Sequence, residues 1–244
     1  MIQPLYRGES PFGKYKVVDM TYNDRPARML FGDQSSPQSG VATDDNPELL
    51  FDYNQRFMEL IMSVQPKRLL VIGGGAFTLP TAVFYHSPRL QVDVVEIDEL
   101  LVQLGHEYFG LPEDPRLRVF VDDGAAFLQA HRGRYDMIIV DAFSGLAIPQ
   151  QLLDDTALML YKKHLTRGGV VAVNVISEYT SKRYRLAHQL VDGFERYFKS
   201  VELFQADPEY EAGVDQNYLL VAGAKAPDVS YLQSEVVPRV FVGR

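Results

Sequence analysis

The stretch Leu69-Leu70-Val71-Ile72-Gly73-Gly74-Gly75-Ala76 decides the fold, because it joins four large apolar residues directly to three glycines. Consecutive apolar residues without alternation are typical of a strand that is buried on both faces of a parallel sheet. Glycines at the carboxyl end of such a strand allow a tight turn and the close approach of a ligand, toward which the next helix points its free N–H groups. The stretch therefore predicts a binding site for a nucleotide-like small molecule.

Apolar runs and helical patterns alternate on the carboxyl side of this stretch. Strands are expected at 68–72, 91–97, 117–121, 136–141 and 169–175. Helices are expected near 77–85, 98–108, 124–132, 151–165 and 182–199. This order predicts βαβ crossovers and a doubly wound α/β sheet. Two closing runs, joined by a polar segment at 206–216, predict an antiparallel hairpin at one edge of the sheet, with strands at 201–205 and 217–223.

The residues before this stretch predict a smaller β-rich unit. Two β-prone runs, 14–20 and 26–31, flank the polar turn Tyr22-Asn23-Asp24-Arg25 and indicate a hairpin. Residues 32–47 are rich in Gly, Ser, Pro, Asp and Asn, which predicts a loop without an element of its own. A helical pattern covers 48–64. We therefore divide the chain into a small N-terminal β unit with its loop (1–47) and a nucleoside-binding catalytic domain (48–244).

Composition narrows the classes of partner. The chain has 244 residues, 46% of them hydrophobic and 23% charged, as in an ordinary globular protein, and its net charge is −8. The acidic charge favours small cationic substrates and argues against broad contact with nucleic acid or an anionic membrane. There is no cysteine, the five histidines lack the paired spacing of metal ligands, and no apolar run is long enough to span a bilayer. The start of the chain also lacks the features of a signal peptide. These features predict a cytoplasmic protein without a metal site.

Carboxylates follow the predicted strands at the same edge of the sheet. Glu96 comes about 20 residues after the glycines, the position at which an acid contacts ribose hydroxyls, so we favour that role over a solvated carboxylate. Asp122 and Asp123 precede Gly124, where capping of the next helix and contact with an adenine are both open. Asp141 leads into an irregular loop and is placed either to act on a substrate or to form a turn.

This succession distinguishes between two kinds of nucleotide fold. The chain has no GKS or GKT phosphate loop, and the glycines leave no room for a pyrophosphate. The pattern is therefore more typical of a class I S-adenosylmethionine-dependent methyltransferase-like (Rossmann-like) fold than of a dinucleotide fold. Two weaker signals carry no function: Ser144-Gly145 lacks the preceding glycine of a nucleophile elbow, and the basic cluster Lys182, Arg183 and Arg185 suits a solvated face.

The ordered motifs resemble those of the spermidine synthases (polyamine aminopropyltransferases). The resemblance covers about residues 11 to 223, and Gln38 and Tyr53 look like the glutamine and tyrosine that flank the family's active site. The motifs that carry it are Val71-Ile72-Gly73-Gly74-Gly75, Val95-Glu96-Ile97-Asp98, Asp123-Gly124 with Phe127-Leu128, and Tyr135-Asp136-Met137-Ile138-Ile139-Val140-Asp141.

The resemblance implies a role for each part of the site. Decarboxylated S-adenosylmethionine would lie over Gly73, Gly74 and Gly75, with its ribose on Glu96 and its adenine near Asp123 and Gly124. Asp141 would help to deprotonate and orient a polyamine amine, and Gln38, Tyr53 and Ser144 would line the substrate site. The resemblance also implies a reaction without a metal and a homodimer built through the N-terminal strands.

Two positions keep other functions open. Ala76 and Ser144 stand where the family usually has aspartates. Because a methyl donor retains its own carboxylate, their absence favours a methyltransferase that uses S-adenosylmethionine as one alternative. A non-catalytic protein that binds a nucleoside such as methylthioadenosine is the other.

Overall fold

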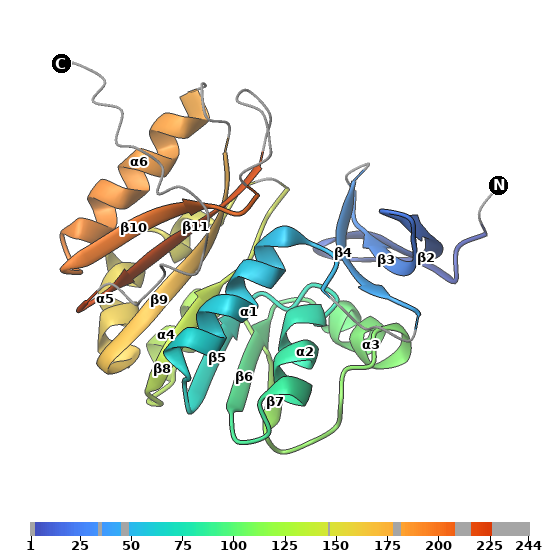
Figure 1. Cartoon of the computed structure of the whole chain (residues 1–244), viewed down its shortest axis with the longest axis horizontal. Coiled ribbons are helices and arrows are strands. Elements are labelled where there is room, and N and C mark those ends of the chain that lie inside the picture. Colours follow the sequence, from blue (N-terminus) through green and yellow to red (C-terminus); the bar gives the residue numbers. More distant parts are fainter. Residues whose placement is uncertain are drawn as a thin grey trace.

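The computed structural model describes residues 3–33, 36–44, 49–145, 147–177, 182–207 and 216–225, without the side chains of 182–186. Within these residues the chain forms a four-stranded sheet followed by a larger, seven-stranded sheet with helices on both faces. Figure 1 shows the small sheet on one side of the large one, above the ends of its central strands. The basic cluster at the start of the last helix has its side chains outside the described residues.

The small sheet is an antiparallel meander in chain order. Asn23 and Asp24 both adopt positive φ angles, 47° and 60°, as a two-residue hairpin turn of the primed type requires. The predicted hairpin is therefore confirmed. Its strands are β1 (Tyr6–Ser10), β2 (Gly13–Tyr22), β3 (Arg25–Phe31) and β4 (Pro37–Ala42).

The prediction of a loop without structure over 32–47 is wrong. β4 lies within that range and pairs with β3, so Gln38 is on a strand rather than on a loop. The sequence of β4 lacks large apolar residues because Ser39 and Gly40 face Thr78 and Met29, where there is little room. Its backbone bonds come from a partner strand, which local composition does not reveal.

The large sheet has the strand order β10-β11-β9-β8-β5-β6-β7. The strands from β5 to β9 pair in parallel, whereas β11 pairs antiparallel with both β9 and β10. The doubly wound sheet and its closing antiparallel hairpin are therefore confirmed. The strands are β5 (Arg68–Ile72), β6 (Gln91–Glu96), β7 (Leu117–Val121), β8 (Tyr135–Val140), β9 (Leu165–Ser177), β10 (Ser200–Gln205) and β11 (Gln216–Gly223).

Helices cover both faces of this sheet, as Figure 1 shows. The core under α4, α5 and α6 contains Ile72, Val140 and Phe194, and the core under α1 and α2 contains Val71, Ile139 and Phe57. Alternate residues of β5 and β8 thus serve opposite cores, as in strands buried on both faces. The helices are α1 (Asp52–Val64), α2 (Thr78–His86), α3 (Glu99–Tyr108), α4 (Gly124–Ala130), α5 (Asp155–His164) and α6 (Lys182–Glu195).

Several predicted boundaries need correction. The helix expected at 151–165 is a short 3-10 turn, η1 (Gln150–Leu152), followed by α5, because Asp154 accepts a bond from Ala157 N and caps a new start. The strand expected at 169–175 extends over 165–177, and the helices expected at 124–132 and 182–199 end at 130 and 195. No helix among the described residues is long and apolar enough to cross a membrane.

The side of the sheet on which successive strands are added changes at its centre, between the parallel strands β5 and β8. β6 and β7 follow on one side of β5, and β8 and β9 lie on the other. In open α/β sheets the crevice beside such a switch point, at the carboxyl ends of the strands, is where ligands bind. The small sheet lies over this same edge, which encloses the crevice.

Candidate active site

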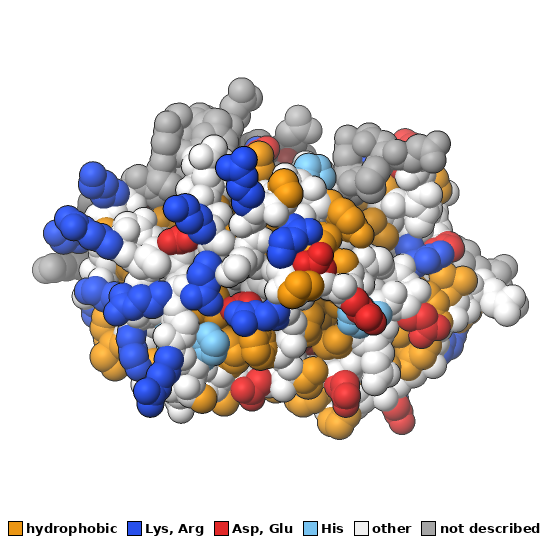
Figure 2. All heavy atoms as spheres, turned by 90° about the horizontal axis from the view of Figure 1, so that it is seen from below, with side chains coloured by type: hydrophobic (Ala, Val, Ile, Leu, Met, Phe, Trp, Pro, Cys, Tyr) orange, Lys and Arg blue, Asp and Glu red, His pale blue; other side chains and the backbone are white. Residues whose placement is uncertain are grey.

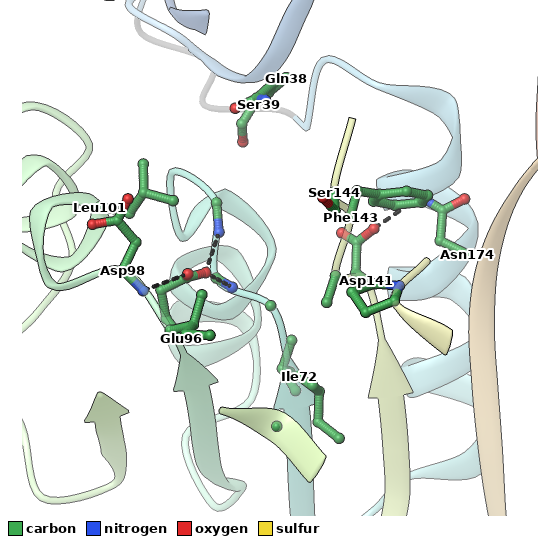
Figure 3. Close-up of a pocket in the computed structure, with 18 of the residues that line it drawn as sticks. Gln38, Ser39, Ile72, Glu96, Asp98, Leu101, Asp141, Phe143, Ser144 and Asn174 are labelled. Carbon is green, nitrogen blue, oxygen red and sulfur yellow. Dashed lines mark hydrogen bonds between the residues drawn. The ribbon is translucent and has the colours of Figure 1, made fainter. Parts of the chain in front are cut away.

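A cavity of about 790 Å³ lies between the carboxyl ends of the central strands and the small sheet, a size ordinary for a small-molecule site. Figure 3 shows Glu96 and Asp98 on one side of it, Asp141 and Asn174 on the other, and Gln38 above from β4. The structure brings every residue predicted for the site to this one cavity: Gln38, Tyr53, Gly73, Gly74, Gly75, Glu96, Asp123, Gly124, Asp141 and Ser144.

The glycine turn after β5 is built by backbone contacts on two sides. Gly73 has a φ angle of 96°, and a Cβ there would lie 2.3 Å from the carbonyl oxygen of Asp141. Ile72 O accepts a bond of 2.8 Å from Asp141 N, so the ends of β5 and β8 are held together. Only glycine fits this approach. The first glycine of the opening stretch therefore fixes the distance between the two halves of the site.

Glu96 holds the other side of this turn. Its Oε2 accepts bonds from Gly74 N at 2.7 Å and Gly75 N at 3.3 Å, and its Oε1 accepts one from Asp98 N at 3.0 Å. Burial raises the pKa of this carboxyl, and the backbone bonds oppose that rise. Glu96 thus braces the glycine turn from inside, while it also lines the cavity where a ribose contact was predicted.

The structure shows which of Asp122 and Asp123 caps the helix that follows them. Asp123 Oδ1 accepts bonds of 2.9 Å from Ala125 N and Ala126 N, so this residue caps α4. Asp122 Oδ1 accepts a bond of 2.8 Å from Asp123 N and is exposed. Both line the cavity. The capping role is therefore present, and it leaves Asp123 Oδ2 without a bond to a described residue.

Asp141 faces the cavity from the end of β8. Asn174 Nδ2 on β9 donates a bond of 2.8 Å to Asp141 Oδ1, and burial raises the pKa of Asp141 to about 7. Tyr53 on α1 is close enough for the Asp141 charge to add to the effect of burial, and its pKa lies well above the ordinary value. Tyr53 therefore stays protonated, and its hydroxyl can donate a hydrogen bond. A carboxyl with a pKa near neutrality, beside a hydroxyl donor, is equipped to accept a proton from a substrate.

The small sheet closes the cavity from above. Ser39 and Thr78 share a buried hydroxyl contact of 3.2 Å, which places β4 over the start of α2. Gln38 beside it is exposed and lines the cavity. Ser144, after β8, is exposed and also lines it. Ala76 is not a lining residue: it is fully buried in a cluster with Leu30 and Leu104.

The sequence reasoning missed two polar residues of the site. Asn174 is the one polar side chain in the apolar run 170–175, and an isolated buried amide of this kind indicates a specific partner. Asp98 was quoted only as part of a motif. It is 1% exposed, caps α3 through Leu100 N and accepts bonds from Ser10 Oγ and the Tyr15 hydroxyl of β2. Neither partner of Asp98 could be assigned before the small sheet was placed.

The described residues contain no group of three or more His, Asp or Glu side chains arranged to hold a metal ion. The buried imidazole His164 illustrates why: both of its ring nitrogens bond to backbone oxygens, those of Gly133 and Leu128. The polar side chains that line the cavity are carboxylates, amides and hydroxyls.

Comparisons of the sequence with known proteins agree on one family. The model of the spermine/spermidine synthase domain matches residues 51–215. A probable polyamine aminopropyl transferase of Bifidobacterium longum is 30% identical over 173 residues, which are 70% of this chain and 37% of that protein. A polyamine aminopropyltransferase of Hamiltonella defensa is 26% identical over 224 residues, 84% of this chain and 75% of that protein. The chain thus spans between about a third and three quarters of the length of these relatives.

Comparisons of the structure agree on the fold. A probable spermidine synthase from Corynebacterium glutamicum has a TM-score of 0.79 at 21% identity and covers 90% of this chain and 80% of its own. A spermidine synthase in complex with the transition-state analogue AdoDATO has a TM-score of 0.73 at 18% identity, covering 92% and 75%. Human methyltransferase-like protein 13, in complex with SAH, has a TM-score of 0.60 at 21% identity, covering 73% and 84%. The predicted class I methyltransferase-like fold is confirmed.

Proposed function

This chain belongs to the spermine/spermidine synthase family, and from that premise we propose that it transfers an aminopropyl group from decarboxylated S-adenosylmethionine to the amine of a polyamine. The observation that carries the proposal is Asp141, a carboxyl with a pKa of about 7 in the wall of the cavity. An amine acceptor must lose a proton to become a nucleophile, and a base is most effective when its pKa lies near the working pH.

The nucleoside of the donor would occupy the side of the cavity at the ends of β5 and β6. The turn Gly73–Gly75 presents backbone there, and Asp123 Oδ2 is left to accept a bond from the adenine amino group. Glu96 Oε1 makes one bond, to Asp98 N, which leaves a lone pair toward the ribose hydroxyls.

The acceptor would lie on the Asp141 side. Asn174 holds one carboxylate oxygen, which fixes the direction of the other, and Tyr53 and Ser144 supply hydroxyls beside it. Gln38 reaches the cavity from β4 and would separate donor from acceptor. Negative charge at Asp141 suits an acceptor that carries further ammonium groups.

The reaction needs positioning more than activation. The neutral amine attacks the methylene carbon next to the sulfonium, a new N–C bond forms, and the C–S bond breaks with its electron pair moving to sulfur. The products are methylthioadenosine and the elongated amine, which keeps its remaining protons as an ammonium, while Asp141 holds the proton that the acceptor gave up before the attack and later returns it to solvent. Because the leaving group is already cationic, holding the nitrogen in line with the C–S bond accounts for most of the rate.

The test is formation of methylthioadenosine, followed by mass spectrometry, when the purified protein is incubated with decarboxylated S-adenosylmethionine and putrescine, cadaverine or spermidine. Asp141→Asn should lower the rate by about 10²- to 10⁴-fold, the range of a lost general base. Asp155→Asn, which changes an exposed carboxylate on α5, is the control and should leave the rate unchanged.

Two outcomes would contradict the proposal. Absence of methylthioadenosine with all three amines, together with tight binding of the nucleoside, would indicate a non-catalytic binding protein. Transfer of a methyl group from S-adenosylmethionine would indicate a methyltransferase, the activity that Ala76 and Ser144 leave open.

We also propose the finer points that accompany this function in the resemblance. Residues 1–47 would form a separate unit that pairs with a second copy of the chain in a homodimer, and the enzyme would work in the cytoplasm. Leu5 and Phe12, large apolar side chains exposed on the small sheet, support the dimer. Light scattering of the purified protein would test it, and a monomeric mass would contradict it.

A further inference from the structure

The strands of the large sheet begin with basic residues, at the edge opposite the cavity. Because β5, β6, β7, β8, β9 and β10 all run in one direction, their starts share this edge, where β11 also ends. Half of the chain's 24 Lys and Arg residues lie within three residues of these strand ends. They are Lys67, Arg68, Arg89, Arg116, Arg118, Arg132, Arg134, Lys162, Lys163, Arg167, Lys199 and Lys225. We call this edge the basic edge.

Figure 2 looks at this edge from below and shows Lys and Arg side chains gathered under α5 and β9 and continuing toward the middle of the molecule. Against these twelve cations, four acids lie within the same distance of the strand ends: Asp93, Asp114, Asp136 and Glu202. Asp93 is buried beneath Arg118 and Arg68, with the first of these at 2.8 Å, and Asp114 pairs with Arg116 at 3.4 Å. The net charge of −8 is therefore unevenly distributed, with acids around the cavity and cations at the opposite edge of the sheet.

Most of these cations are not neutralised within the described residues. Their side chains are exposed, and they form no ion pair with a described acid: Lys67, Arg89, Arg132, Arg134, Lys162, Lys163, Arg167, Lys199 and Lys225. Lys162 and Lys163 also face the negative end of the α5 dipole, which accounts for part of the arrangement. Helix ends do not account for Arg89, which lies between α2 and β6, or for Arg167, which lies near the start of β9.

We propose that the basic edge binds the phosphodiester backbone of a nucleic acid without reading its bases. The strand starts follow one another at about 4.8 Å, so seven strands give a row of roughly 29 Å, which matches a linear polyanion. Leu5, Phe12, Ile97 and Val121, which are exposed large apolar side chains, lie elsewhere, whereas Met62 and Tyr85 lie near this edge in the last turns of α1 and α2. A membrane-binding face needs several apolar anchors beside its cations, and these two are few beside the nine cations that form no ion pair with a described acid, so a membrane is the poorer partner.

This proposal goes beyond the aminopropyl transfer proposed above and does not depend on it. The cavity opens at the opposite edge of the same sheet, so a nucleic acid on the basic edge would leave it free. The sequence predicted no nucleic-acid partner from the net charge alone. The distribution of that charge, which requires the strand order, points the other way.

The experiment measures binding of labelled nucleic acid to the full chain by fluorescence anisotropy. A DNA duplex of about 20 base pairs and a single-stranded RNA of similar length are titrated between about 50 and 200 mM salt. We expect binding that weakens steeply with salt. The variant Lys163→Glu/Arg167→Glu should bind at least about 10-fold more weakly at low salt and lower the salt slope by about 2, close to one per lost phosphate contact.

The matched control is Arg7→Glu/Lys14→Glu, which reverses two exposed charges on the small sheet and should bind as the unchanged chain does. Formation of methylthioadenosine should be the same in both variants, which separates this surface from the cavity. Absence of binding at low salt, or an equal loss in both variants, would overturn the proposal. So would binding to vesicles that contain phosphatidylserine without binding to either nucleic acid.

Discussion

At the scale of the residue, Asp141 combines burial with a single fixed partner. Asn174 donates one bond to it, and no cation pairs with it among the described residues. Two terms therefore compete: burial disfavours the charged form, and the amide favours it. Burial dominates, and the pKa rises to about 7. A cationic substrate beside it would reverse this balance, which suits a group that must release and accept protons in turn.

This pKa predicts how stability depends on pH. The carboxyl of Asp141 binds its proton more tightly in the folded chain than in the unfolded chain. Its contribution to stability is therefore complete below about pH 4 and is lost as the pH rises through 7. Asp141→Asn lacks the charge at every pH. We expect the variant to be more stable at pH 8, with a free energy of unfolding about 2–4 kcal/mol above that of the unchanged chain. Near pH 4 the two free energies should agree closely.

Urea denaturation at the two pH values measures this difference. Asp155→Asn, at an exposed site, should show no comparable change between them. An Asp141→Asn variant that is less stable than the unchanged chain at both pH values would show that the carboxylate form is the favoured one.

Ala76 shows how a departure from a family pattern acquires a physical reason. Its side chain is fully buried against Leu30 and Leu104, and α3 and the small sheet pack over it. A carboxylate there would lose its hydration among the hydrophobic side chains of this cluster. The alanine is therefore matched to the packing of this chain, and any partner for the donor's amino group must come from another residue of the cavity.

At the scale of the element, the turn after β5 makes two strand ends depend on each other. Gly73→Ala would place a Cβ 2.3 Å from a backbone oxygen of Asp141, at a positive φ angle. The left-handed conformation alone costs roughly 1–2 kcal/mol, and the clash adds to it because backbone cannot rotate away. We expect the free energy of unfolding to fall by about 3 kcal/mol or more and nucleoside binding to be lost.

Gly168→Ala is the matched control for this prediction. Gly168 has a similar φ angle, 86°, but nothing lies within 4 Å of the position that a Cβ would take. It should therefore lose only the cost of the conformation. Equal losses in the two variants, measured by urea denaturation, would show that the contact between β5 and β8 has no part in the effect.

The same turn explains how much could be predicted from the sequence. Strands buried on both faces can be recognised from their apolar composition. The sequence therefore predicted β5, β6 and β8, and the acids that follow them, to within one or two residues. β4 was missed because its evidence is a neighbouring strand, not its own residues. The bonds that Glu96 accepts from the glycines, and that Asp141 accepts from Asn174, join residues far apart in the chain, and only the folded structure sets their distances.

At the scale of the whole molecule, the cavity exists because one sheet is held over another. Ser10 Oγ and the Tyr15 hydroxyl both donate to the carboxylate of Asp98, which is 1% exposed at the start of α3. The hydroxyl contact between Ser39 and Thr78 joins the sheets at a second point. The small sheet thereby carries Gln38 to its position above the glycine turn.

We expect the two hydroxyls that bond to Asp98 to hold the small sheet over the cavity. In Ser10→Ala/Tyr15→Phe, a buried carboxylate keeps its bond from Leu100 N but loses both hydroxyl donors. Bonds to a charged group contribute about 1.5–3 kcal/mol each, so we expect the free energy of unfolding to fall by about 2–5 kcal/mol. Calorimetry with methylthioadenosine should show weaker binding as well, since the sheet that covers the nucleoside is released. Tyr6→Phe/Thr21→Ala removes two hydroxyls from the same sheet without touching Asp98 and should change neither quantity. A nucleoside affinity that stays constant while stability falls would mean that the small sheet stabilises the fold without shaping the site, and the role proposed for Gln38 at the cavity would then fail with it.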